Sequence, residues 1–290
     1  MRTRDFFYAP SGALRAPWRI GLFLAIALAA YTALAIVLAA LWPGLITAAA
    51  VDLAALYGFG LIGVGAVLFA HLVCLRWVDR LSWSHVAMAR AAADPRTLGH
   101  GFLVGGLALA APAGVLLLIG WLEIRPVAEG SWTAFAAMSL IALAPAALFE
   151  ELLLRGYPFA VLRESWGWKP ALLLTSAVFG VWHGWNPSAT PLAIAMVTLA
   201  GVFLGAVLLA TGSLYAAWTA HLAWNWVLVG VLHTEVSGIE IPVPDYRMTD
   251  VGPAWATGGS WGPEGGLFAG LGMIAATGYL LSRWRRREQP

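Results

Sequence analysis

WRIGLFLAIALAAYTALAIVLAALW, residues 18–42, is the stretch that decides the fold of this protein. Arg19 is its single charged residue, and the apolar run that follows continues to Trp42. A run of about 24 apolar residues is too long for a signal-peptide core of roughly 7–15 residues, and it is long enough to cross a bilayer as one helix. We therefore expect a transmembrane helix that is retained.

The composition of the whole chain agrees with a membrane protein. Of the 290 residues, 60% are hydrophobic and 11% are charged, whereas ordinary soluble domains have roughly 25% charged residues. The net charge of +2 comes without a basic face, so we expect no binding of nucleic acid. The predicted partner is the lipid bilayer, and the predicted location is the cell (plasma) membrane, which the chain crosses several times.

Eight runs are apolar and long enough to be candidate spans. With both termini in the cytoplasm, all of the 17 lysines and arginines except Arg125 and Arg247 fall on the cytoplasmic side, as the positive-inside rule requires. The predicted fold class is therefore all-α, a polytopic bundle of about eight transmembrane helices. The candidate spans lie at about 18–42, 50–75, 101–122, 132–154, 170–187, 191–211, 213–233 and 265–283.

The spans suggest three parts of the chain and no separate soluble domain. Residues 1–129 hold the first three spans, residues 130–235 hold spans four to seven, and residues 236–290 hold an outer loop and the last span. The stretch 234–264 is rich in Pro, Gly and Trp, and we expect an irregular loop that rests on the membrane surface. No internal repeat is visible, which argues against a transporter, since many transporters are built from repeats.

The first polar cluster inside the predicted spans is EELLLR at 150–155, at the inner end of the fourth span. Ionisable groups in membrane helices are costly and mark functional sites by default. Glu151 and Arg155 stand four residues apart and can pair on one helix face, which leaves Glu150 free. A partly desolvated carboxylate suits a proton acceptor. The alternative is a solvated helix end at the cytoplasmic surface.

Two histidine clusters follow, FGVWH at 179–183 in the fifth span and HLAWN at 221–225 in the seventh. His183 is either a functional group or a packing residue within its helix. His221 and Asn225 share a helix face because they are four residues apart, so two hydrogen-bonding groups can grip one oxygen atom. The alternative for this pair is hydrogen bonding between helices, which polar residues in membranes often supply.

These three clusters, in this order and on separate spans, resemble the CAAX-protease and bacteriocin-processing (CPBP) family. That family of intramembrane proteases includes type II CAAX prenyl proteases and Abi-like proteins. Its pattern is a Glu-Glu pair with Arg four residues after the second Glu, then Phe-x-x-x-His, then His-x-x-x-Asn. The resemblance covers about residues 130–235. The matching residues here are Glu150, Glu151, Arg155, Phe179, His183, His221 and Asn225.

The resemblance implies an intramembrane endopeptidase that cuts a membrane-associated protein or peptide. In the implied mechanism Glu150 and His183 activate a water, and His221 and Asn225 hold the oxyanion. Glu151 and Arg155 are implied as a supporting pair that fixes the helix end. Peptide hydrolysis needs these parts, namely a general base, a positioned water and stabilisation of negative charge.

No cofactor is favoured, because the chain contains no His-Glu-x-x-His helix. The alternative is zinc, held by Glu150, His183 and His221 with a water as the fourth ligand.

Two other functions compete with the peptidase. One is a non-catalytic membrane scaffold or immunity protein of the same fold, against which the intact motifs argue. The other is a transporter that uses the same buried polar groups as an ion path. The substrate is left open among prenylated proteins, peptide pheromones, bacteriocin leaders and the tails of membrane proteins.

Overall fold

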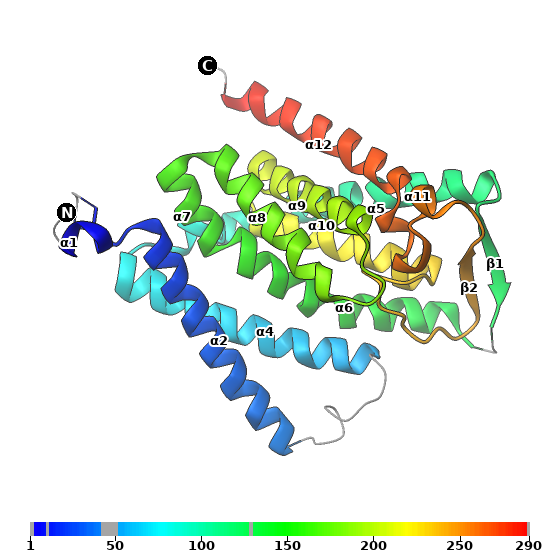
Figure 1. Cartoon of the computed structure of the whole chain (residues 1–290), viewed down its shortest axis with the longest axis horizontal. Coiled ribbons are helices and arrows are strands. Elements are labelled where there is room, and N and C mark those ends of the chain that lie inside the picture. The colour runs from blue at the N-terminus through cyan, green and yellow to red at the C-terminus, as the bar shows by residue number, and fades with distance from the viewer. Residues whose placement is uncertain (1–2, 10–11, 42–51, 128–129, 289–290) are drawn as a thin grey trace.

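The computed structural model describes residues 3–9, 12–41, 52–127 and 130–288, and it is a bundle of helices with a two-stranded sheet at one end (Figure 1). The long helices are α2 (Ala16–Leu41), α4 (Leu53–Val73), α5 (Pro95–Leu118), α6 (Trp132–Arg155), α8 (Trp168–Trp182), α9 (Pro191–Thr211), α10 (Leu214–Trp226) and α12 (Leu267–Glu288). The shorter elements are α1 (Thr3–Phe7), α7 (Tyr157–Trp166), α11 (Ala254–Thr257), β1 (Leu122–Pro126) and β2 (Tyr246–Asp250).

Each predicted span overlaps one of these long helices, although positions 42, 50 and 51 of the predicted spans lie outside the described residues. The helices α8 and α10 have 15 and 13 residues, fewer than the roughly 20 that a bilayer requires. The helical membrane bundle is confirmed, whereas the number of eight spans and the cytoplasmic termini stay predictions. Five helical segments among the described residues are long and apolar enough to cross a membrane, namely Ala16–Leu41, Leu53–Asp79, Pro95–Leu118, Trp132–Trp166 and Pro191–Thr211.

Helix α10 lies inside the bundle, packed against α5, α6 and α9. Two glycines of α5 bring this helix close to α10. A Cβ atom on Gly105 would lie 2.1 Å from the carbonyl oxygen of Ala220, and Gly101 stands in the same way against Ala216. Small residues at four-residue spacing let helix backbones approach closely in a membrane, where van der Waals packing drives association. This packing holds in place the helix that carries His221.

A tight turn joins α9 to α10. Helix α9 ends at Thr211, and Gly212 follows in the left-handed region with φ of 67°, a conformation that glycine adopts without strain. The hydroxyl of Ser213 then accepts the N–H of Ala216 at 3.1 Å and caps α10. The turn that separates the predicted sixth and seventh spans is thereby confirmed, and α9 and α10 run antiparallel side by side.

A buried histidine fixes the break between α6 and α7. The Nδ1 nitrogen of His71 in α4 lies 2.8 Å from the carbonyl oxygen of Val67, and its Nε2 accepts the backbone N–H of Tyr157 at 3.0 Å. Gly156 at the break leaves room for this ring, because a Cβ atom there would lie 2.3 Å from Nε2. His71 thus supplies the hydrogen bond that the first residue of α7 cannot find within its own helix.

Residues 234–266, called the cap segment below, connect the end of the α10 region to α12 at the β1–β2 end of the molecule (Figure 1). They contain β2, α11 and two short 3₁₀ turns, Gly259–Trp261 and Pro263–Gly265. Strand β2 pairs antiparallel with β1, with Met248 opposite Ile124. Trp261 is 1% exposed, and the second 3₁₀ turn packs against α9 and α12. The stretch 234–264 therefore differs from the irregular loop expected there, because it buries its own apolar side chains.

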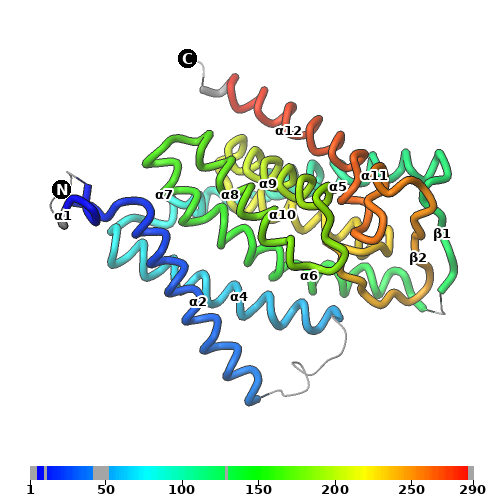
Figure 2. Tube along the Cα trace, viewed as in Figure 1, coloured from blue at the N-terminus to red at the C-terminus, as the bar shows by residue number. Residues whose placement is uncertain are grey.

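The chain trace in Figure 2 shows α1 at the end of the molecule opposite the β1–β2 pair, and α12 running from the cap segment toward that side. The two arginines that the predicted topology places outside, Arg125 and Arg247, are paired opposite each other in that sheet. Both of these arginines therefore lie in the same two-stranded sheet.

Candidate active site

A buried ion pair within α6 lies beside the site. The guanidinium of Arg155 donates to Oε1 of Glu151 at 3.1 Å, and neither side chain is exposed. The same guanidinium donates to the carbonyl oxygen of Gly201 in α9 at 3.3 Å and lies over the ring of Phe179, 4.5 Å from its centroid. The predicted Glu151–Arg155 pair is therefore present, and it also ties α6 to α8 and α9.

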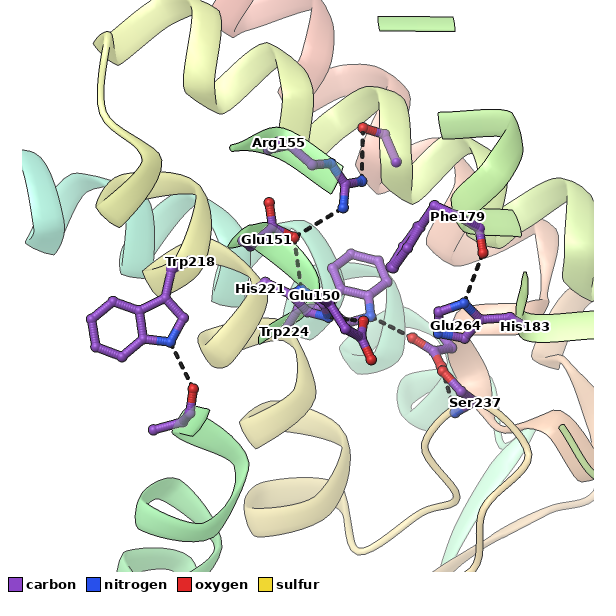
Figure 3. A network of polar contacts seen from close by, with 12 residues as sticks. Glu150, Glu151, Arg155, Phe179, His183, Trp218, His221, Trp224, Ser237 and Glu264 are labelled. Atoms are coloured by element: carbon purple, nitrogen blue, oxygen red, sulfur yellow. Dashed lines mark hydrogen bonds and ion pairs between the residues drawn. The ribbon is translucent and has the colours of Figure 1, made fainter. Parts of the chain in front are cut away.

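Glu151 has a second partner that its place in the sequence does not reveal. Its Oε1 oxygen lies 2.9 Å from Nδ1 of His221 in α10 (Figure 3). A carboxylate oxygen accepts, so Nδ1 carries the proton. The other ring nitrogen of His221, Nε2, then faces Oε2 of Glu150 at 3.7 Å. Two neighbouring carboxylates of α6 thus lie against the two nitrogens of one imidazole.

His183 lies where α8 ends and a short 3₁₀ turn, His183–Trp185, begins. Its Nδ1 nitrogen donates to the carbonyl oxygen of Phe179 at 2.8 Å, because a backbone carbonyl has no proton to give. In the neutral ring Nε2 therefore carries a lone pair and is available as a base. The ring of Phe179 lies between the two histidines, with centroids 4.5 Å from His183 and 5.9 Å from His221.

His183, His221 and Asn225 line one cavity of about 20 Å³. A space of about 10–15 Å³ or more accommodates a water molecule when polar partners surround it. Most of the remaining wall is apolar and comes from α9. Glu150 touches His221, but it is not one of the residues that line this cavity. The structure thus joins three of the four predicted catalytic residues around a cavity of water size.

A zinc ion would need Glu150, His183 and His221 to gather as one ligand set. In the part of the chain that the structure describes, no three His, Cys, Asp or Glu side chains lie close enough together to hold a metal ion. The described side chains therefore do not form the ligand set that the zinc alternative requires.

Sequence reasoning missed Glu264, which lines the same cavity and is 7% exposed. It comes from the cap segment, where it stands in a run of Gly and Pro with no periodic pattern to mark it. Trp224 also lines the cavity, whereas Trp182, the neighbour of His183 in the chain, is 37% exposed and lines apolar grooves beside α2.

A comparison with known protein families matches one part of the chain. The family model described as type II CAAX prenyl endopeptidase Rce1-like matches residues 132–227. The matched residues include α6 to α10, which carry the candidate site, and leave the cap segment outside. No curated protein and no solved structure matches the chain. The predicted resemblance to the CPBP family of proteases is confirmed over these residues.

Proposed function

We propose that this protein, which carries an Rce1-like type II CAAX prenyl endopeptidase domain at residues 132–227, is an intramembrane endopeptidase that hydrolyses a peptide bond in a membrane-associated protein or peptide. The family match is to endopeptidases of the CAAX type. The matched domain lies within a bundle of apolar helices. One observation carries the proposal: Glu151 holds His221 so that its Nε2 nitrogen faces Glu150.

In the proposed reaction Glu150 and His183 activate a water molecule. The hydrogen bond of His183 to the carbonyl of Phe179 supports this role, because it leaves Nε2 as the basic nitrogen. The side chain of Glu150 is 23% exposed, so water can reach this carboxylate. An O–H bond of the water breaks, its proton passes to the base, and the oxygen forms a bond to the scissile carbonyl carbon.

The oxyanion of the tetrahedral intermediate is assigned to His221 and Asn225. The Asn225 amide offers N–H donors, and His221 donates from Nε2 when its ring is protonated. The carboxylates on either side of the ring, Glu150 and Glu151, balance that charge. The intermediate collapses as the C–N bond breaks and the stored proton passes to the leaving nitrogen. The products are a new carboxyl terminus and a new amino terminus, and one water is consumed.

The test uses the full chain reconstituted in liposomes. The probe is a farnesylated peptide ending in a CAAX sequence, with a fluorophore and a quencher on either side of the bond, compared with the same peptide without the lipid. Glu150→Gln and His183→Ala should each lower cleavage at least about 100-fold. The matched control is Glu123→Gln, a carboxylate in β1 that is 51% exposed and should cleave like wild type.

A second arm finds the natural substrate. Membrane and secreted peptides from cells with wild type, Glu150→Gln and His183→Ala, at equal expression, are compared by mass spectrometry. A product seen with wild type alone supports the proposal, and its cut site names the substrate class. Identical peptide profiles together with no cleavage of either reporter would favour the scaffold or immunity function. Loss of cleavage on adding a zinc chelator, with recovery on adding zinc, would replace the metal-free mechanism.

A further inference from the structure

We propose that Glu264 of the cap segment is a positioning residue of the candidate active site, which holds Trp224 as a wall of the cavity and makes the cap segment part of the catalytic unit. The kinetic half of this inference rests on the proposed peptidase function, and the labelling half does not. The residue lies outside the stretch that the family model matches.

The carboxylate of Glu264 is held by three short hydrogen bonds (Figure 3). Its Oε2 oxygen accepts the indole N–H of Trp224 at 2.6 Å. Its Oε1 oxygen accepts the backbone N–H of Ser237 at 2.6 Å and the hydroxyl of the same residue at 2.8 Å. All three donors are neutral. A buried carboxylate held by neutral donors is costly in a protein interior, so a packing role alone explains it poorly.

The three residues of this contact come from two separate parts of the chain and meet at the cavity. Trp224 is on α10, next to Asn225 and one turn from His221, and is 4% exposed. Ser237 and Glu264 are near the two ends of the cap segment, and both line the cavity. Glu264 therefore joins the two ends of the cap segment through Ser237. Through Trp224 it also joins the cap segment to α10, the helix that carries the proposed oxyanion donors.

The size of the cavity explains why this fastening matters for catalysis. At about 20 Å³ the cavity has room for a water molecule, and a bound water is held well when its walls do not move. The indole of Trp224 is one of those walls. A side chain of the wall that is held by a hydrogen bond keeps the reacting groups in their productive positions. A displacement of a reacting group by about 1 Å can lower the rate on the order of 100-fold.

The kinetic test is a double-mutant cycle in liposomes with the farnesylated reporter peptide. Glu264→Gln puts an amide N–H₂ against one of the donors, and Trp224→Phe removes the indole N–H. Each should lower kcat about tenfold while KM changes less than about threefold. The double variant should be no slower than the slower single variant, because both remove the same bond. Wild-type kcat in Glu264→Gln, or effects that multiply in the double variant, would overturn the inference.

The matched control lies in the same segment. Glu240 is a carboxylate whose side chain is 69% exposed and which pairs with Arg247 away from the cavity. Glu240→Gln removes the same charge from the cap segment and should leave kcat and KM at wild-type values. An equal loss in this control would assign the effect to charge and not to the contact with Trp224.

The labelling test needs no activity. Cys74 is buried and is the chain's single cysteine, so Cys74→Ala gives a background for a probe at Val197, which lines the cavity and is 5% exposed. Val197→Cys should react slowly with a membrane-impermeant maleimide in liposomes. Adding Glu264→Gln should raise the rate about tenfold, and adding Glu240→Gln should not. An unchanged rate in folded Glu264→Gln protein would overturn the inference.

The two arms separate the two hypotheses. If wild type cleaves no peptide, the peptidase function fails while the labelling rates still decide whether Glu264 closes the cavity. If Glu264→Gln does not fold, Ser237→Ala takes its place in both arms, because it removes one of the three hydrogen bonds. It should shift kcat and labelling in the same directions by about threefold, and wild-type values for both would overturn the inference.

Discussion

The Oε1 oxygen of Glu151 lies 2.9 Å from Nδ1 of His221, although the two residues are 70 positions apart in the chain. The same oxygen accepts a hydrogen bond from Arg155 at 3.1 Å. One buried carboxylate oxygen therefore connects the ion pair that fixes the end of α6 to the histidine of α10. This atom therefore serves both the stability of the fold and the proposed chemistry. We expect substitution of Glu151 to lower the stability of the protein and substitution of its neighbour Glu150 to leave the stability unchanged.

Glu151→Gln should destabilise the protein, because it leaves the buried Arg155 guanidinium without a carboxylate. Removal of one partner of a buried ion pair costs about 3–5 kcal/mol, which should lower the midpoint of thermal unfolding in detergent by at least about 6 °C. Glu150→Gln is the matched control, since that side chain is 23% exposed and should keep the midpoint within about 2 °C. Equal midpoints for the two variants would contradict this division of roles.

Two of the buried histidines, His221 and His71, should separate catalysis from stability. His221→Asn removes a proposed oxyanion donor, and we expect kcat/KM for the reporter peptide to fall about 100- to 1,000-fold. His71→Ala should leave kcat/KM at 25 °C within about threefold of wild type, because His71 bonds the backbone of Tyr157 at the α6–α7 break. Its unfolding midpoint should fall, since that N–H loses its acceptor. A His71→Ala enzyme with normal stability and no activity would refute the assignment.

Two glycines of α5 should respond oppositely to the same substitution. Gly105→Ala would place a Cβ atom 2.1 Å from the carbonyl oxygen of Ala220, so α5 and α10 must separate, at a cost of about 1–3 kcal/mol. At Gly114 a Cβ atom would meet nothing within 4 Å, and alanine is the better helix former by about 0.5–1 kcal/mol. Thermal unfolding in detergent should show a lower midpoint for Gly105→Ala and an equal or higher one for Gly114→Ala.

The predicted orientation is testable with single cysteines in the Cys74→Ala background. Ile124 in β1 is 62% exposed at the end of the bundle that we place outside the cell. Ala91 is exposed in the connection between α4 and α5, which we place in the cytoplasm. A membrane-impermeant maleimide added to intact cells should label Ile124→Cys and should reach Ala91→Cys only after lysis. The reverse pattern would invert the topology.

Local sequence patterns predicted most of the helices and the order of the polar clusters. Apolar runs of the right length located the long helices, and the spacing of Glu151 and Arg155 located their ion pair. The sequence did not predict the structure of the cap segment, because its Gly- and Pro-rich stretch has no helical or alternating period. In the structure, strand β2 of this segment pairs with β1. Pairing between segments more than 100 residues apart is a property of the folded chain and not of either segment.

The sequence by itself determined that this protein belongs in a bilayer, where its helices lie, and that Glu151 shares a helix face with Arg155 and His221 with Asn225, because hydropathy and four-residue spacing are local properties. The tertiary structure decided that Glu151 contacts His221 in addition to Arg155, and that Glu264 lines the cavity. Those contacts cross 70 and 40 residues of chain. They depend on how α6, α10 and the cap segment pack, and a carboxylate looks the same in the sequence whether its partner is one turn away or on another helix.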